Sequence, residues 1–353
     1  MTRQLLSLIA AVLLLVIPSN AQTDSGGRIA YHARPDGNID IYIMNADGSD
    51  IQRLTTDPGN DTSPDWSPDA ASIVFDSSRG ADDPTDSEIH RYDFDTDSIR
   101  SMTSGNGSSA DPDWSPDGSL IALEANYGRE QFALWTLNDA ATSIRYISRS
   151  DNTYQNPAWS PDGTQIAVSI LTDGDYEIYI TDVDGEILSQ LTDAQGLDFA
   201  PSWSPDGTQI VFESDRDGDS DIYIINATGD NLRQLTDDPG RDRFPAWSPD
   251  GSTIAFSSDR DGDFEIYTMD TSGGNLVQLT DNDWTDLEPD WEPRSDAARR
   301  VPQPTLVAQA DTPTATSTPG SLPPPIVLPT ETASSTPGSL PPLPTIVLPT
   351  ETA

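Results

Sequence analysis

The stretch Phe244-Pro-Ala-Trp-Ser-Pro-Asp-Gly-Ser-Thr-Ile-Ala-Phe256 recurs with small changes along the 353-residue chain. Its tryptophan returns at intervals of 48, 45, 44, 44 and 44 residues, as Trp66, Trp114, Trp159, Trp203, Trp247 and Trp291. Five copies continue as Trp-Ser-Pro-Asp, whereas the sixth reads Trp-Glu-Pro-Arg. A period near 44 residues, built from short strands and tight turns, is typical of a β-propeller blade.

Each repeat contains four short apolar runs separated by turns rich in Asp and Gly, which is the pattern of antiparallel hairpins. The first unit has them at 28–31, 40–44 and 51–55, and the tryptophan strand follows at 64–66. The chain therefore enters a blade at its second strand, and the last tryptophan strand, 288–291, has no partners after it. Circular closure resolves both ends and hides their edges. We predict an all-β, six-bladed propeller of four-stranded blades, closed where the N-terminal strands complete the last blade.

Composition excludes several functional classes. The formal charge is −41, because 59 acidic residues face 18 arginines and no lysine. Such acidity disfavours binding to nucleic acid or to anionic membrane. Without cysteine the chain has no disulfide, no thiolate metal site, no cysteine nucleophile and no lipoprotein anchor. Acidity alone is explained by solubility, so it does not define a site.

The two ends of the chain differ from the repeats. Residues 1–21 have a basic start, an apolar core and a small-residue cleavage site, so we expect a signal peptide cleaved after Ala21. We assign 22–300 to the propeller and expect no membrane span there. Residues 301–353 are rich in Pro, Thr and Ser, and their second half nearly repeats the first. This composition predicts a disordered tail.

The repeated residues have structural explanations. We predict that the six tryptophans fill the wedges between adjacent blades. The Ser-Pro-Asp-Gly segment suits a tight turn, because Pro favours the second position and Gly accepts a positive φ. A sugar-stacking role for the tryptophans would require them to be exposed.

Acidic loops are the only segments with plausible site chemistry. Asp215 to Asp221 and Asp259 to Glu265 place carboxylates at alternate positions, as calcium sites do. The spacing does not match an EF-hand, and hairpin turns with solvated acids are the preferred explanation, so we assign no metal, cofactor or catalytic residue. His32 and His90 lie in different blades without evident partners. No hydrolase or phosphate-binding motif is present.

The repeat Pro-x-Trp-Ser-Pro-Asp-Gly, with Ile-Ala-Phe, Ser-Asp-Arg-Asp-Gly-Asp and Leu-Thr after it, resembles the TolB-type propeller repeat. The resemblance covers roughly residues 28–293. It implies a six-bladed propeller that binds other proteins of the bacterial cell envelope. TolB proteins have an amino-terminal α/β domain, whereas here the blades begin close to the expected cleavage site. Related repeats accompany peptidase domains, and propeller lyases use several histidines that are missing here.

We therefore expect a secreted or periplasmic, non-enzymatic binding module, monomeric, without cofactor, whose partner is another envelope or extracellular protein. The expected binding surface is one face of the propeller or its central channel. Two alternatives stay open: a carbohydrate-active propeller enzyme (lyase or glycosidase), and a calcium-stabilised surface adhesin.

Overall fold

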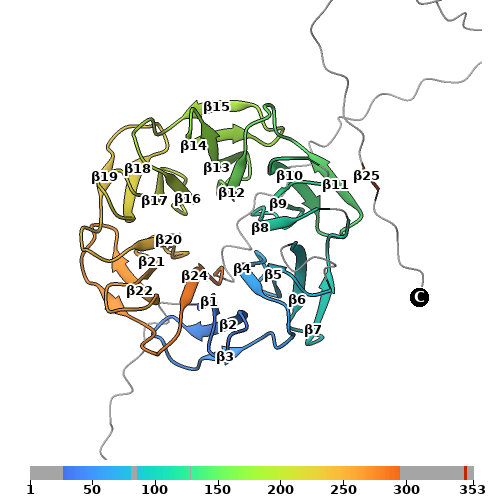
Figure 1. Ribbon diagram of the computed structural model, residues 1–353, viewed down its shortest axis with the longest axis horizontal. Helices are drawn as coiled ribbons and strands as arrows, with labels where there is room; N and C mark the ends of the chain where they lie inside the picture. Colours follow the sequence, from blue (N-terminus) through green and yellow to red (C-terminus); the bar gives the residue numbers. More distant parts are fainter. Residues whose placement is uncertain (1–26, 81–85, 106, 128, 295–345, 348–353) are drawn as a thin grey trace, which may run out of the picture.

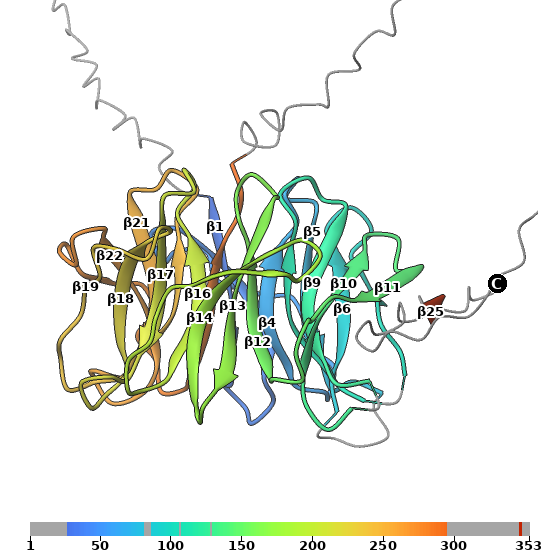
Figure 2. The same cartoon turned by 90° about the horizontal axis from the view of Figure 1, so that it is seen from above.

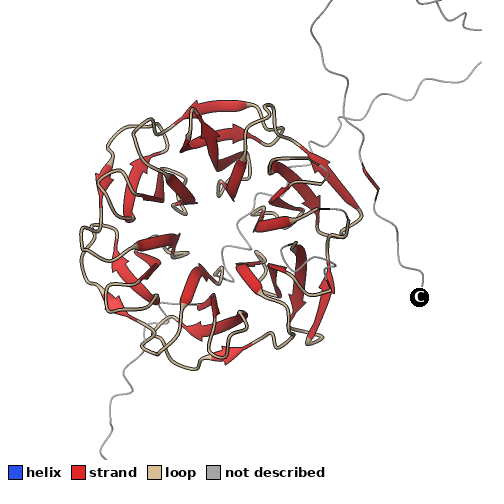
Figure 3. Ribbon diagram, viewed as in Figure 1, coloured by secondary structure: helices blue, strands red, loops and turns tan. Residues whose placement is uncertain are grey.

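Six β-sheets are arranged around a central axis, as Figure 1 shows in the view along that axis. The computed structural model describes residues 27–80, 86–105, 107–127, 129–294 and 346–347. No α-helix occurs in these segments, and strands account for all of their regular structure (Figure 3). The prediction of an all-β, six-bladed propeller with four-stranded blades is confirmed.

Each blade is an antiparallel sheet whose strands follow one another outward from the axis. Blade 1 has β24 (Asp286–Trp291), β1 (Arg28–Ala33), β2 (Asp40–Asn45) and β3 (Gln52–Arg53); blade 2 has β4 (Asp61–Trp66), β5 (Ser72–Ser77), β6 (Glu88–Asp93) and β7 (Ser98–Ser101); blade 3 has β8 (Ser109–Trp114), β9 (Leu120–Ala125), β10 (Ala133–Asn138) and β11 (Ser143–Tyr146). Blade 4 has β12 (Tyr154–Trp159), β13 (Gln165–Thr172), β14 (Asp175–Asp182) and β15 (Ile187–Gln190); blade 5 has β16 (Asp198–Trp203), β17 (Gln209–Ser214), β18 (Asp221–Asn226) and β19 (Arg233–Gln234); blade 6 has β20 (Asp242–Trp247), β21 (Thr253–Ser258), β22 (Glu265–Asp270) and β23 (Val277–Gln278). A short strand, β25 (Ile346–Val347), pairs with the outer edge of β11.

The ring closes in blade 1, where the last inner strand pairs with the first strand of the chain. Ile29 lies opposite Trp291, and Ala33 lies opposite Asp286. The Arg28 guanidinium adds a clamp, because its Nη2 lies 2.8 Å from Oε1 of Glu292. The predicted closure is confirmed.

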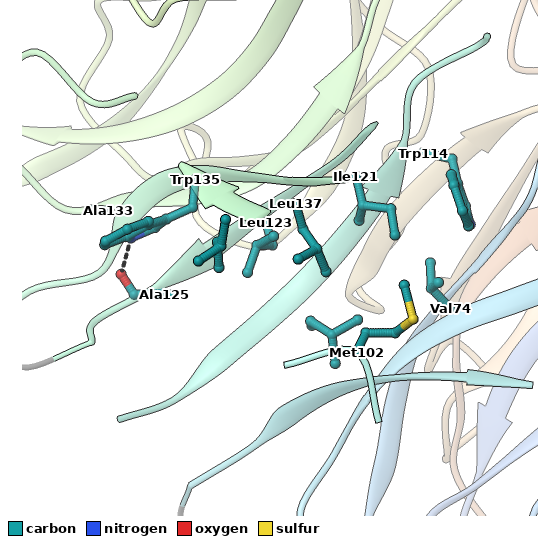
Figure 4. Packing of buried hydrophobic residues seen from close by; sticks show 11 residues of the cluster. Val74, Met102, Trp114, Ile121, Leu123, Ala125, Ala133, Trp135 and Leu137 are labelled. Atoms are coloured by element: carbon teal, nitrogen blue, oxygen red, sulfur yellow. Dashed lines mark hydrogen bonds between the residues drawn. The ribbon is translucent and has the colours of Figure 1, made fainter. Parts of the chain in front are cut away.

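The hydrophobic core lies between neighbouring blades. The view from the side shows the sheets standing side by side around the ring (Figure 2). Between blades 2 and 3, Val74 and Met102 pack with Trp114, Ile121 and other buried side chains (Figure 4). All six repeat tryptophans are buried, with exposed fractions between 2% and 9%. Burial on this scale excludes the sugar-stacking role that would need exposed rings.

The Ser-Pro-Asp-Gly segment turns the chain from the inner strand into the second strand. In blade 6, Ser248 Oγ donates to Asp250 Oδ1 (2.8 Å), and the Gly251 N–H donates to the Ser248 carbonyl (2.9 Å). Gly251 has φ +72°. Ala70 occupies the same place in blade 2 with φ 57°, a conformation that costs an alanine more than a glycine.

The expected signal peptide and nearly all of the expected tail lie outside the described residues. Within the described part of the chain, no helix is long and apolar enough to cross a membrane.

Candidate functional site

Every inner strand has a β-bulge directly before its repeated Pro-x-Trp. The bulge is visible as a register shift in the pairing of all six inner strands. The residue before the proline has a positive φ, between 47° and 57°, in all six blades. These six bulge residues are Ser63, Asp111, Asn156, Ala200, Phe244 and Glu288. Positive φ is unfavourable for side chains as bulky as that of Phe244. A β-bulge changes the direction in which a side chain points, and the six bulge residues line the central channel.

The central channel contains a cavity of about 290 Å³. The six bulge residues and their prolines line it, together with the residue before each tryptophan. Consecutive inner strands contact one another around this ring. The lining therefore forms two layers, one of bulge residues and one of residues that precede a tryptophan.

One hydrogen-bonded line connects the bulge residues of blades 1 to 4. The Ser63 N–H donates to Glu288 Oε2 (2.8 Å), and Ser63 Oγ donates to Asp111 Oδ1 (2.8 Å). Asn156 Nδ2 donates to Asp111 Oδ2 (2.7 Å). His32 Nδ1, on β1, lies 3.0 Å from Glu288 Oε2. We call Glu288, Ser63, Asp111 and Asn156 the acidic arc, and the equivalent residues of blades 5 and 6, Ala200 and Phe244, the apolar arc.

The two carboxyl groups of the acidic arc have opposite pKa shifts. Burial, followed by the charges of Glu288 and Asp76, raises the pKa of Asp111 to about 7. Burial alone would also raise the pKa of Glu288, but the nearby His32 and hydrogen bonds from Ser63 outweigh it and lower that pKa. Near neutral pH, Glu288 is therefore ionised while Asp111 is partly protonated.

The second layer contains three aspartates on the side of the acidic arc. Each accepts a hydrogen bond from the backbone N–H of the tryptophan in the next blade. Asp290 bonds to Trp66 (2.9 Å), Asp65 to Trp114 (2.7 Å) and Asp113 to Trp159 (2.7 Å). Burial raises the pKa of Asp113 to about 8 and the pKa of Asp290 to about 7. Burial, together with the charges of Asp290 and Asp113, raises the pKa of Asp65 well above its usual range.

On the apolar side, the second layer uses backbone carbonyls to connect neighbouring blades. The Trp203 indole N–H donates to the Ala158 carbonyl (3.1 Å), and the Trp291 indole N–H donates to the Ala246 carbonyl (3.2 Å). Ser202 provides the sixth connection by accepting from the Trp247 N–H (3.3 Å). All six blade contacts are therefore bridged, but by different groups on the two sides.

Behind the bulge layer lies the second strand of each blade, and the fifth residue of that strand is polar and buried in all six blades. The six are His32, Asp76, Glu124, Ser169, Glu213 and Ser257. Burial raises the pKa of Asp76 to about 6 and the pKa of Glu124 well above its ordinary value. Oδ1 of Asp76 and Oε2 of Glu124 have no hydrogen-bond partner among the described residues.

The acidic loops lie away from this channel lining and are partly structural. Arg216 donates to both carboxylate oxygens of Asp198, at 2.9 and 2.8 Å, so it fastens the loop to the start of β16. Asp217, Asp219 and Asp221 have ligand atoms within 4.8 Å of one another, the only such metal-like group found in the described segments. Gln234 Nε2 already donates to Asp217 and Asp221.

The sequence-based interpretation located the tryptophans but missed most of the channel chemistry. His32 lies beside Glu288, a neighbour that the sequence did not reveal. The two residues are 256 positions apart, and closure of the ring brings them together. His90 Nδ1 lies 3.0 Å from the Glu88 carbonyl. The missed signal is the variable residue before each Pro-x-Trp, which changes while its surroundings repeat.

The comparisons with known proteins agree with this geometry. The model of the TolB beta propeller domain family matches residues 19–155, 88–223 and 216–305. No curated protein sequence matches the chain.

Solved structures share the fold at low sequence identity. TolB from Acinetobacter baumannii is 22% identical, with a TM-score of 0.67 over 77% of this chain and 68% of its own. A TolB-type protein from Agrobacterium tumefaciens is 23% identical, with a TM-score of 0.61 over 76% of this chain and 99% of its own. The tricorn protease is 16% identical, with a TM-score of 0.58 over 72% of this chain and 26% of its own. The family model spans most of the chain, and the chain belongs to the TolB β-propeller domain family.

Proposed function

We propose that the chain is a secreted or periplasmic, non-enzymatic module that binds another protein of the envelope or exterior through the mouth of its channel. One observation carries this proposal. The six blades keep the same bulge, proline and tryptophan, yet the bulge residue that faces the cavity differs in every blade. A uniform scaffold with a varied lining is how a repeat protein builds a specific binding surface.

Family membership supports a protein partner. The structures named TolB share this propeller, and the acidity of the chain suits a partner with basic groups. We propose that the chain acts as a monomer and needs no cofactor.

The test is affinity capture from envelope extract with the full chain, tagged at its C-terminus, as bait. We compare the wild type with Ala246→Phe, which fills the cavity, and with Thr228→Phe, which adds the same ring on the exposed β18–β19 turn. One stoichiometric partner that is lost only with Ala246→Phe supports the proposal. Capture that both variants retain, or capture of basic proteins that moderate salt abolishes, refutes a channel-mouth site.

A carbohydrate-active enzyme is the second candidate, favoured by the opposite pKa shifts of Glu288 and Asp111. Pairs of carboxyl groups with separated pKa values perform acid–base hydrolysis of glycosides. Here Asp111 would donate the proton and Glu288 would act as base or nucleophile. Turnover of a panel of polysaccharides and aryl glycosides, abolished by Glu288→Gln, would establish hydrolysis in place of simple binding. The tricorn protease shows that such propellers also occur within enzymes.

A further inference from the structure

The acidic arc offers hydrogen-bond acceptors to the cavity that its own contacts leave unused. Ser63 and His32 both approach Oε2 of Glu288, whereas Oε1 accepts no hydrogen bond from the described residues. Glu288 is itself part of the cavity wall. Oε1 is therefore available to a donor that enters the cavity, since none of the described residues donates to it.

Two further carboxyl groups reinforce this position from behind. Asp76 and Glu124 are 7% and 4% exposed, and each has one oxygen without a hydrogen-bond partner in the described chain. The charge of Glu288 acts on Asp76, and the charges of Asp111 and Asp76 act on Glu124, so the four groups share one field. Repulsion among neighbouring carboxyl groups is costly, and a cation bound in the cavity beside Glu288 and Asp111 would relieve it.

The arrangement suits a many-donor organic cation better than a metal ion. A metal needs several ligand oxygens converging within a few ångströms, and the described residues meet that condition only at Asp217, Asp219 and Asp221, outside the channel lining. In the acidic arc, Ser63 stands between Glu288 and Asp111 and bonds to both. A guanidinium spreads five N–H donors over a plane, so it can reach acceptors that are separated in this way.

The opposite wall supplies the complementary apolar contact. Ala200, Phe244 and the prolines at 201 and 245 line the cavity across from the acidic arc. An aliphatic stem or an apolar neighbouring residue can pack there while the charged head reaches the carboxylates.

From this juxtaposition we propose that the channel recognises a segment of the partner that presents an arginine or lysine beside an apolar residue. The charged head binds the line Glu288–Ser63–Asp111, and the apolar residue packs on Phe244 and Ala200. This inference rests on the proposed function, since it specifies what the channel mouth binds.

The test uses the full chain and two peptides, Gly-Leu-Arg-Leu-Gly-amide and the same peptide with neutral citrulline in place of arginine, each labelled at its amino terminus with an uncharged coumarin fluorophore. We expect the arginine peptide to bind at least about tenfold more tightly in fluorescence anisotropy. We expect Glu288→Gln to weaken it by about tenfold, and Asp95→Asn, which removes one charge from the exposed β6–β7 turn, by less than about twofold.

Binding should also tighten as pH rises from 5 to 8, because the cation favours ionised carboxyl groups. Burial raises the pKa of Asp111 to about 7 and of Asp76 to about 6. The other titratable groups facing this region are His32, Glu124 and Glu288, with Asp65, Asp113 and Asp290 in the layer below. Proton release on binding, measured by calorimetry in buffers of different ionisation enthalpy, checks the same linkage.

Equal affinity for the arginine and citrulline peptides overturns the inference on the wild type alone, even if Glu288→Gln fails to fold. In that case protein capture that remains sensitive to Ala246→Phe leaves the proposed function standing. Calcium binding that depends on Glu288, without a preference for arginine, overturns the inference in favour of a metal. Failure of both peptides to bind, together with an empty capture experiment, overturns inference and proposed function alike.

Discussion

The acidic and apolar sides of the channel have the same backbone but differ in how they join neighbouring blades. Beside the acidic arc, Asp290, Asp65 and Asp113 accept from tryptophan backbone N–H groups. Beside the apolar arc, two backbone carbonyls accept from indole N–H groups. The first solution places titratable groups in the channel, whereas the second adds no charge. One scaffold therefore accommodates two linings, because each contact between neighbouring blades can be bridged in more than one way.

The largest expected effect concerns the buried tryptophans, and it tests whether the acidic and apolar sides are equally well packed. Trp114→Ala on the acidic side and Trp203→Ala on the apolar side each remove a buried ring. Each should lower the free energy of unfolding by about 3–5 kcal/mol, measured by urea denaturation. If either variant left the free energy of unfolding almost unchanged, the two sides would differ in packing as well as in lining.

A smaller effect should appear in the pH dependence of stability, to which the second-layer aspartates of the acidic side contribute. Folding raises the pKa of Asp113 to about 8 and of Asp290 to about 7, so the folded state holds protons that the unfolded state releases. Their contribution to stability is complete below the unfolded pKa near 4 and is lost as pH rises through 7 to 8. We expect the Tm to fall by about 4–8 °C between pH 5 and pH 8.5.

Asp113→Asn isolates the contribution of Asp113, because the amide oxygen can still accept from the Trp159 N–H without becoming charged. The variant should lose part of the fall in Tm between pH 5 and pH 8.5. Ser202→Ala, at the equivalent position on the apolar side, serves as the control and should keep the wild-type pH profile. An unchanged profile in Asp113→Asn would mean that other carboxyl groups determine the pH dependence.

The indole bridges predict a difference of about 1 kcal/mol between two conservative variants. Trp203→Phe loses the bond to the Ala158 carbonyl, whereas the Trp114 indole N–H has no partner among the described residues. Trp203→Phe should therefore destabilise more than Trp114→Phe in the same denaturation assay. Equal losses would show that the indole bond contributes nothing to the blade contact.

The smallest expected effect concerns calcium at the acidic loops. Gln234 and Thr236 already donate to Asp221, and Gln234 also donates to Asp217. We expect millimolar calcium or EDTA to shift the Tm by less than about 1 °C. A larger rise with calcium that Asp219→Asn abolishes would instead support the calcium-stabilised adhesin.

Most of the fold was predictable from the sequence, because the 44-residue period repeats its strands, turns and tryptophans. Ring closure was predictable too, since the repeat pattern starts with the second strand of a blade and finishes with the first strand of a blade. The channel chemistry was not. Asp111 and Glu288 occupy the position that varies between blades, so a search for what repeats passes over them. His32 pairs with Glu288 only once the ring is closed, and a contact over 256 positions has no local signal.

Closure in blade 1 also determines how the ring responds to mechanical load. Arg28, at the start of β1, and Glu292, just after the end of β24, are bonded to each other, so the two ends leave the same end of one antiparallel ladder. Tension applied to both ends would therefore open the ladder one bond at a time, as a zipper, instead of shearing all of its bonds together. We expect low unfolding forces in an optical-tweezers experiment that pulls the ring from its two ends. The strand pair that closes the ring is therefore also a seam at which force can open it.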